Sequence, residues 1–530
     1  MADPEPFIVW PAPGLPALVQ EEQARLALIV ALSDRDAGSV ARWAETLAFR
    51  ETFGEASVPA VVEAVEPVDR DRVEPAARGF AELPSTGGLT LLRVRVRASA
   101  PLQADAASPV RLYDLAAGGT VVRARSVAAF GGTRRRLRLA FAGDLHFASF
   151  WDEIGEAVDR YAPDLATQML RPTRLLERFI AEANRLWSRG ELDLVVLGGD
   201  LVEYVFDQPR GAIAAGSGET NVHRVVRALR DLRVPTVAIP GNHEYRAFPW
   251  RPRTYGLASV GIPAARTGSL LKRAGLWDRW PLRLSDFDAL RTEDESGEPA
   301  LAHYLRLLAP GTDFALELHG TRLVFASTGC DLLSRWTTVE GPRRGLLLQS
   351  LRHCWLCPDS EGLSDGRVGQ IAGSLSSARG AAVFFHAPLL NPPEDAKVEE
   401  CVGQLDPGSG DDLAGRVAFE RRIGRSGMRR GVFFRNPGPL VRALVSAAGP
   451  VVTFSGHAHQ AGAVEIDRST FAVRSVPAGP PPAPEQTVTM FTAPAVGQLP
   501  HQGNQPPGYL LARFEDGRLD SFQRQTLAEQ

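Results

Sequence analysis

Hydrophobic positions follow one pattern in the first quarter of the chain and another in the rest. Short alternating or apolar runs, ARLALIVAL, LTLLRVRVRA and TVVRARSVAAF, lie within residues 24–130 and are separated by Pro, Gly, Asp and Ser. Alternation of this kind is typical of strands with one buried face. We therefore predict an accessory β-rich domain over residues 1–135, to which the sequence assigns no role.

From residue 136 onward, apolar runs alternate with amphipathic stretches. The runs are LRLAFAG, LDLVVLGG, VPTVAIPG, AAVFFHAP and GPVVTFSG, and between the first two the apolar residues from Leu175 to Trp187 have helical spacing. Buried strands that alternate with amphipathic helices are typical of layered α/β folds. We predict an α/β domain over residues 136–530, with inserts at about 245–315 and 390–440 and a closing hairpin at Asp516-Gly517.

Polar residues that can bind metals follow each of these five runs. In chain order they are Asp144 and His146, Asp200, Asn242 and His243, His386, and finally His457 and His459. Ligands of open α/β sheets bind beyond the carboxyl ends of the strands, so the five segments are expected to converge. A single Asp or His at a strand end is more often a cap or a core residue. The combination favours a metal site, because half of the ten histidines fall in these motifs.

The spacing within the motifs gives a geometric expectation. Residues i and i+2 of an extended chain project to the same face, so Asp144 and His146 are expected to serve one site together, as are His457 and His459. A glycine directly precedes four of the candidate ligands. These glycines are expected to let the backbone turn sharply beneath the metals.

Charge favours two metal ions. Asp144 and Asp200 carry two negative charges against four positive charges on two divalent cations, and the excess would neutralise a phosphate group. Two metals about 3.5–4 Å apart can activate a bridging water and stabilise the displaced oxygen. Nitrogen and oxygen ligands suit Mn, Fe, Zn or Ni. We expect two divalent or trivalent transition-metal ions and hydrolysis of a phosphate ester by a metal-bridging hydroxide.

The order of the motifs resembles that of the calcineurin-like metallophosphoesterase family. Asp-x-His, Gly-Gly-Asp, Gly-Asn-His-Glu, a single His and Gly-His-x-His occur in sequence, and the resemblance covers about residues 136–520. It implies a four-layer sandwich of two mixed sheets flanked by helices. It also implies an enzyme, a phosphoric ester hydrolase.

The resemblance further implies a role for each motif residue. One metal would be held by Asp144, His146, Asp200 and His459. The second would be held by Asp200 as a bridge, with Asn242, His386 and His457. His243 would face the substrate as a general acid or as a group that stabilises the transition state.

Two further functions use the same residues. A phosphodiesterase or nuclease would need the same metal ligands, which do not distinguish the two activities from that of a phosphomonoesterase. A non-catalytic metal-binding scaffold is the alternative from another class. A relic site is expected to have lost ligands, whereas this chain retains the set and His243.

Composition restricts the partners. The formal net charge is −3, so no overall field attracts nucleic acid or acidic membranes. No run approaches the 18 apolar residues of a membrane helix, and the first residues lack the pattern of a signal peptide. We expect a cytoplasmic enzyme with a phosphorylated substrate and no membrane partner. Nucleic acid is expected only as a substrate.

Two weaker signals remain. Cys354 and Cys357 could hold a structural zinc, but a second pair is missing and two reduced cysteines are favoured. Residues 420–435, ERRIGRSGMRRGVFFR, lie between His386 and His457. Charge runs are usually solvated surface. In the functional interpretation, the guanidinium groups bind an anionic part of the substrate; they belong to Arg425, Arg429 and Arg430.

Overall fold

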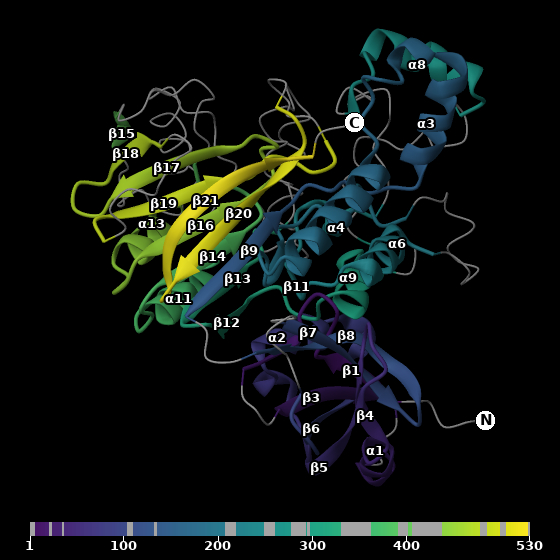
Figure 1. Ribbon diagram of the computed structural model, residues 1–530, viewed down its shortest axis with the longest axis vertical. Coiled ribbons are helices and arrows are strands. Elements are labelled where there is room, and N and C mark those ends of the chain that lie inside the picture. Colours follow the sequence, from purple (N-terminus) through teal and green to yellow (C-terminus); the bar gives the residue numbers. More distant parts are fainter. Residues whose placement is uncertain are drawn as a thin grey trace.

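The structure is a computed structural model of the chain (Figure 1). It describes residues 6–20, 24–33, 37–102, 110–131, 135–206, 219–247, 260–276, 293, 297–329, 362–390, 401–404, 437–476, 485–498 and 505–527. The proposed substrate-binding residues Arg425, Arg429 and Arg430 lie outside these ranges, as do Cys354 and Cys357.

The predicted N-terminal strands form an eight-stranded sheet, drawn in purple and blue at the bottom of Figure 1. In sheet order the strands are β1 (Phe7–Trp10), β3 (Arg25–Leu32), β6 (Thr90–Ala98), β5 (Ser57–Pro67), β4 (Leu47–Glu51), β7 (Val110–Ala117), β8 (Thr120–Phe130) and β2 (Ala17–Val19). Helices α1 (Ala37–Ala44) and α2 (Pro75–Ala81) accompany them. The side chains on one face of this sheet form a hydrophobic core within the N-terminal region, which includes Leu28 and Val94.

The other face of this sheet shares a hydrophobic core with the rest of the chain. Ile29, Leu91 and Leu112 belong to the same buried cluster as Leu139 and Val196, which lie beyond residue 135. The hydrophobic core is therefore continuous across the predicted domain boundary, and that boundary stays a prediction.

A five-stranded sheet carries the first three predicted motifs. Its order is β11 (Thr236–Ala238), β10 (Leu194–Leu197), β9 (Arg136–Ala142), β20 (Gly508–Glu515) and β21 (Arg518–Thr526). Strands β9, β10 and β11 are parallel, so their carboxyl ends meet at one edge. The predicted closing hairpin is confirmed: β20 and β21 pair antiparallel about Asp516 and Gly517, both of which have positive φ.

A second eight-stranded sheet carries the last two motifs. Its order is β12 (Phe314–Leu318), β13 (Thr321–Ala326), β14 (Ala381–Phe385), β16 (Val451–Ser455), β19 (Thr487–Thr492), β17 (Gly462–Asp467), β18 (Ala472–Ser475) and β15 (Cys401–Gln404). Strands β13, β14, β16 and β19 are parallel, so this sheet also presents a common carboxyl edge.

The two later sheets pack against each other through phenylalanines. The Phe141 ring on β9 lies 6.0 Å from that of Phe384 on β14 and 5.7 Å from that of Phe454 on β16. The Phe384 and Phe454 rings stack at 5.3 Å. Stacked rings bury much area with specific geometry, so they set the alignment of the two carboxyl edges.

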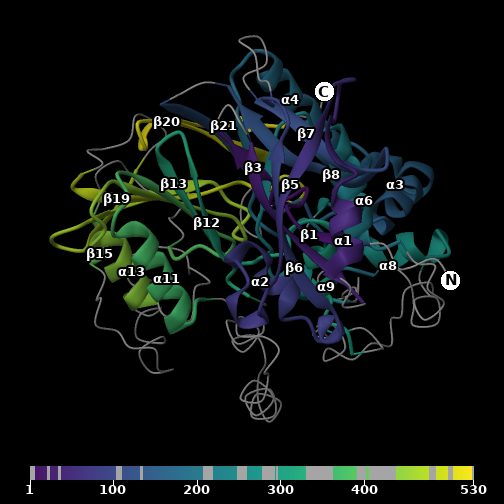
Figure 2. The ribbon, with the colours of Figure 1, turned by 90° about the horizontal axis from the view of Figure 1, so that it is seen from below.

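Helices cover the outer faces of these two sheets. Helix α4 (Pro172–Ser188) has the predicted apolar stripe and packs on the five-stranded sheet. There the ring centroids of Phe179 and Tyr509 lie 5.2 Å apart. Helices α11 (Asp365–Leu375) and α13 (Pro437–Val445) share a core with β14 and β16. Figure 2 shows α11 and α13 on the side opposite to α3 (Phe150–Tyr161) and α6 (Asn221–Ala228).

The predicted α/β class is confirmed, as several mixed sheets flanked by helices. Within the insert predicted at 245–315, helices α8 (Ala264–Arg273) and α9 (Leu301–Leu307) are described. Within the insert at 390–440, β15 and the start of α13 are described. Among the described helices, none is both long enough and apolar enough to cross a membrane.

Candidate metal centre

Every predicted ligand stands just beyond the end of a strand, where the carboxyl edges of the two later sheets meet. A parallel bridge joins Gly143, after β9, to Ala495, after β19. The Gly456 amide, after β16, donates to the His386 carbonyl, after β14, at 2.8 Å. The five motifs therefore come together from two sheets, and not from one sheet alone.

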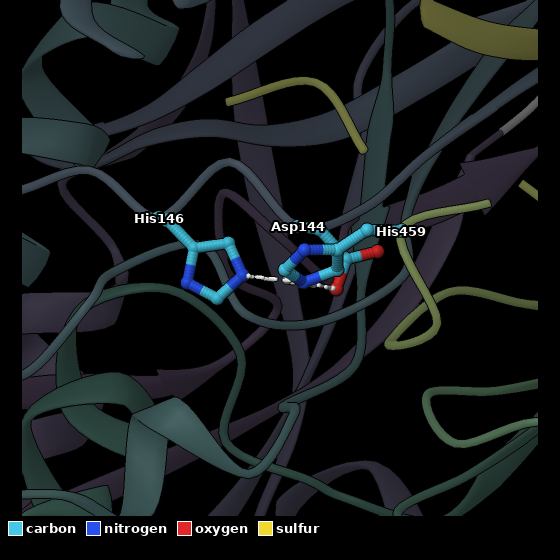
Figure 3. A group of neighbouring side chains, drawn as sticks. All are labelled: Asp144, His146 and His459. Atoms are coloured by element: carbon cyan, nitrogen blue, oxygen red, sulfur yellow. Dashed lines mark hydrogen bonds and ion pairs between the residues drawn. The ribbon is translucent and has the colours of Figure 1, made fainter. Parts of the chain in front are cut away.

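Asp144, His146 and His459 form the first group of candidate ligands (Figure 3). Nε2 of His146 lies 3.0 Å from Nε2 of His459, which lies 3.4 Å from Oδ1 of Asp144. All three side chains are buried. Oδ2 of Asp200 lies 3.7 Å from Nε2 of His146, so the second carboxylate borders this group.

Asp200, His386 and His457 form the second group. Nε2 of His386 lies 3.1 Å from Oδ2 of Asp200 and 3.2 Å from Nδ1 of His457. Oδ1 of Asn242 lies 2.9 Å from Nε2 of His386 and 2.8 Å from Nδ1 of His457. The structure thus brings all seven predicted metal ligands together, and Asp200 lies between the two groups.

The backbone reaches this arrangement through left-handed residues. Asp144, His146, Asp200, His457 and His459 have φ between 48° and 63°. This region is uncommon for residues other than glycine and often marks functional sites. The expectation of extended backbone from Asp144 to His146 is wrong, although both side chains do reach one group. His457 and His459 reach the same cluster of candidate ligands, one in each group.

The glycines before the ligands act mostly through their size. Of these glycines only Gly199 has positive φ, at 92°. A Cβ at Gly241 would lie 2.3 Å from Oδ1 of Asp200, and one at Gly456 would lie 2.5 Å from Oδ2 of Asp144. A side chain there would displace a carboxylate. The sharp turns predicted for the glycines therefore fall mainly on the ligand residues that follow them.

The donor set fits a metal cation. The imidazoles of His386 and His457 and the amide of Asn242 lie around the buried Asp200 carboxylate. Nitrogen and oxygen donors of this kind suit divalent transition metals.

The two histidines of the second group, His386 and His457, together favour one protonated imidazole. Burial opposes protonation of His386, but the adjacent Asp200 and Asp144 carboxylates raise its pKa to about 9. Burial, followed by repulsion from His386, lowers the pKa of His457 to about 3. One proton is thus favoured between two nitrogens 3.2 Å apart. A metal cation bound there would replace that proton.

The two aspartates are ionised despite full burial. Burial by itself would raise both pKa values. The imidazoles of His243, His386 and His146 nevertheless hold the pKa of Asp200 well below its usual range. His459 does the same for Asp144, to a smaller extent. Two buried carboxylates surrounded by imidazoles form a site that attracts cations.

His243 lies beside both groups without joining the second. Its Nδ1 donates to the Glu203 carbonyl at 2.8 Å, and its Nε2 lies 3.7 Å from Oδ2 of Asp200. Burial, with repulsion from Arg246, lowers its pKa well below the usual value. Nε2 is therefore the nitrogen directed toward the two groups, and the role of His243 toward the substrate stays a prediction.

Glu203 and Gln498 were not among the predicted site residues. His146 donates from Nδ1 to Oε2 of Glu203 at 2.8 Å, and Gln498 donates from Nε2 to the same oxygen at 2.7 Å. A carboxylate that accepts from the far nitrogen of a ligand fixes its tautomer and orientation. The proximity of Glu203 to Asp200 in sequence was a signal for it. Gln498 has no motif that reveals it.

Glu244 is the third residue whose role the sequence did not reveal, although it lies in the Gly-Asn-His-Glu motif. Its fully buried carboxylate accepts from the amides of Asp200, Leu201, Val202 and Gly241 at 2.6–3.2 Å. Burial, followed by the charge of Asp200, raises its pKa to about 7. Glu244 therefore joins the turn after β10, which contains Asp200, to the turn after β11, which contains Asn242.

A comparison with protein families agrees with this site. Residues 137–303 match the family model described as calcineurin-like phosphoesterase. The predicted resemblance is therefore confirmed over this segment, and the family implies metal-dependent phosphoester hydrolysis. His386, His457 and His459 lie after the matched segment.

Comparisons of the whole chain with curated proteins and with solved structures are less informative than the family match. No curated protein matches the chain. Among solved structures, GAP50, the anchor in the inner membrane complex of Plasmodium, is 10% identical with a TM-score of 0.25, over 74% of this chain and 90% of that one. A metallophosphoesterase from Sphaerobacter thermophilus is 14% identical with a TM-score of 0.23, over 73% and 87%. Scores of this size do not establish a common overall fold.

Proposed function

We propose that the protein is a metal-dependent hydrolase that cleaves phosphate esters at a dinuclear centre. The observation that carries this proposal is the position of Asp200, whose Oδ2 lies 3.1 Å from Nε2 of His386 and 3.7 Å from Nε2 of His146. One carboxylate thus borders both ligand groups. Asp200 would hold both cations as a shared ligand.

The ligands suit transition metals. In one group, two imidazoles accompany one carboxylate, and in the other two imidazoles and an amide accompany the shared carboxylate. Nitrogen-rich sites of this kind suit Mn, Fe, Zn or Ni. When bound, two such ions supply the positive charge that activates water and neutralises the phosphate.

The protein's own residues supply orientation and proton transfer. Nδ1 of His243 donates to the Glu203 carbonyl, so Nε2 faces the site. Burial lowers the pKa of His243, so in the free protein the imidazole is neutral and Nε2 is an acceptor. The negative charge of a bound phosphate favours the protonated imidazole, whose Nε2 can then hydrogen-bond a phosphate oxygen or pass a proton to the leaving oxygen. Burial excludes water from Asp144 and Asp200 and strengthens their interactions with the phosphate-neutralising cations. The substrate we propose is a phosphorylated molecule.

The same proposal includes the finer architecture. Helix α4, the five-stranded sheet, the second eight-stranded sheet, and helices α11 and α13 follow one another in contact. This order supports a four-layer arrangement for residues 136–530. The first eight-stranded sheet lies wholly within residues 7–130, which supports an N-terminal unit that ends near residue 135.

A metal-supplemented activity screen tests the proposal. The full chain is stripped of metal with a chelator, reloaded with Mn, Fe, Zn or Ni, and assayed on phosphomonoesters, phosphodiesters and nucleotides. We expect turnover of at least one class, loss of turnover with the chelator, and none in Asp200→Asn. A metal-loaded protein without activity on any class would overturn the proposal and leave a metal-binding scaffold.

A further inference from the structure

Asn242 and His243 follow strand β11, which has little support of its own. It has three residues and lies at the edge of the five-stranded sheet, where it pairs only with β10. An edge strand leaves one row of backbone groups without a partner in its sheet. Its position therefore depends on what covers that edge.

The N-terminal segment covers the edge at the end nearest Asn242. The Ala238 amide donates to the Gly14 carbonyl at 2.8 Å, and the Gly14 amide donates to the Leu308 carbonyl at 2.8 Å. A Cβ at Gly14 would lie 2.7 Å from Cγ of Leu308 and 3.2 Å from Cβ of Ala238. A side chain at Gly14 would displace that of Leu308 and press on Ala238, so glycine lets this segment lie against both.

Arg125 of β8 holds the segment that leads into β11. Its guanidinium donates to the Leu229 carbonyl from Nη1, and from Nη2 to the Val234 carbonyl at 2.8 Å. These two carbonyls bracket the turn between α6 and β11. The side chain is 3% exposed, so both hydrogen bonds are shielded from water. Hydrogen bonds donated by a charged guanidinium are stronger than those between two neutral groups.

The N-terminal sheet is built to hold Arg125 in place. Arg125 has a φ of 49° at an irregular point of β8, and its amide donates to Oδ1 of Asp114 at 2.7 Å. Thr52 donates to the same oxygen at 2.7 Å. The Asp114 carboxylate thus supplies the hydrogen bond that the irregular ladder omits, so the Arg125 backbone is fixed from within the N-terminal sheet.

A second buried arginine on the same strand holds helix α9. Arg123 donates from Nη1 to the Arg306 carbonyl, in the last turn of α9, at 3.1 Å. A cation is favourable at a helix carboxyl end. Helix α9 packs in turn against the short 3-10 helix His243–Tyr245. Burial lowers the pKa of Arg123 and of Arg125 to about 10, so both remain charged at neutral pH.

We propose that residues 7–130 are a brace that positions Asn242 and His243, with Arg125 as the main positioning residue. The inference rests on the proposed function for its catalytic consequence, but not for its structural one. Gly14 hydrogen-bonds to the last residue of β11, and Arg125 hydrogen-bonds to the turn that precedes its first residue. Arg123 hydrogen-bonds to helix α9, which packs against residues 243–245. The N-terminal sheet is then a working part of the site and not an independent module.

The test compares Arg125→Met with Arg70→Met in the full chain. Arg70 also donates to main-chain carbonyls, those of Ala81 and Leu89, but both lie within the N-terminal region. Hydrogen exchange is measured on metal-free protein. In Arg125→Met we expect amides of residues 229–245 to exchange about tenfold faster or more, because local opening becomes easier. In Arg70→Met we expect those amides to remain as in wild type.

Activity and metal affinity give the second readout. In Arg125→Met we expect kcat to fall by roughly tenfold or more with KM nearly unchanged, since small misplacements of catalytic groups are costly. Metal held by the group that includes Asn242 should bind more weakly. Arg125→Lys keeps the charge and should recover part of each effect; it is also the variant to measure if Arg125→Met does not fold.

The outcomes separate the brace from the proposed function. If both methionine variants lose similar thermal stability while exchange at residues 229–245, metal affinity and kcat match wild type, the brace is overturned. If wild type shows no phosphoesterase activity but Arg125→Met alone raises exchange at residues 229–245 and weakens metal binding, the brace stands and the proposed function fails.

Discussion

The two ligand groups are supported in different ways. In the first group, His146 donates from its far nitrogen to a side chain, the Glu203 carboxylate, which Gln498 also contacts. In the second group, His386 donates from its far nitrogen to a main-chain carbonyl, that of Gly198, at 2.8 Å. One histidine is therefore oriented by an anion and the other by the strand end itself.

The difference separates electrostatic support from geometric support. A carboxylate partner makes the imidazole a stronger electron donor and adds negative charge beside the metal. A carbonyl in the turn after a buried strand fixes the ring without adding charge, and no substitution of a side chain removes it. We therefore expect the first group to respond to changes in the residues behind it, and the second to respond to the position of its backbone.

The largest expected effect removes what the two groups share. Asp200→Asn takes away the charge that borders both groups, so metal content should fall at both positions and turnover should be abolished. Elemental analysis and an activity assay check this. At most one tightly bound metal in fully loaded, fully active wild type would break the comparison, because only one group would then be a metal site.

The next largest effect is expected from His243→Ala, which leaves the residues of both ligand groups unchanged. His243 lies beside them and is proposed to contact the substrate, so His243→Ala should retain metal. The rate on esters with poor leaving groups should fall by about 10²–10⁴, the usual range of general acid–base catalysis. The rate of hydrolysis of activated aryl phosphates should fall much less. His223→Ala is the control, because His223 caps α6 instead. Equal losses on both substrates would argue against a proton donor.

Glu203→Gln sharpens the comparison most directly. It keeps the size of the side chain but removes the negative charge behind His146, so affinity for one metal should fall by about 10–100-fold. The second metal should bind as before. Competition with a calibrated chelator measures both. Glu182→Gln, which alters a carboxylate paired with Arg185 on α4, is the matched control. Equal weakening of both metals would show that the two supports are not separate.

The smallest effect concerns the arginines between His386 and His457. Replacement of Arg425, Arg429 and Arg430 by Ala should raise KM for a polyanionic substrate about tenfold, on the basis of roughly 1–2 kcal/mol of lost binding. A small aryl phosphate should be hydrolysed almost as before. This result would place the anionic part of the substrate on the side of the second group. If both substrates respond alike, or neither does, the segment is solvated surface.

Much of the fold follows from local pattern. The alternating strands before residue 130, the apolar stripe of α4 and the hairpin at Asp516-Gly517 each depend on residues close together in the chain, and all three form where predicted. The candidate ligands were found for the same reason. Each polar residue follows a buried run, and the end of a buried strand is readable from the chain alone.

Contacts between distant segments could not be read in this way. Glu203 was missed because its partners, His146 and Gln498, are 57 and 295 residues away. The extended geometry expected at Asp144 was wrong because five ligand residues adopt left-handed φ, which the surrounding strand ends stabilise. Local propensity makes that conformation uncommon for any residue other than glycine, even though Asp and His adopt it more often than most.

By itself, the sequence determined the order and type of the elements and the chemistry of the ligands, because both depend on the side chains within a few residues. Tertiary structure produces the division of those ligands between two groups, which the family resemblance implied and no local pattern did, since it depends on how the carboxyl edges of two sheets align through Phe141, Phe384 and Phe454. It also decided the place of the N-terminal sheet. Arg125 meets the Leu229 carbonyl across 104 residues, and the energy of such a contact depends on packing that no local pattern records.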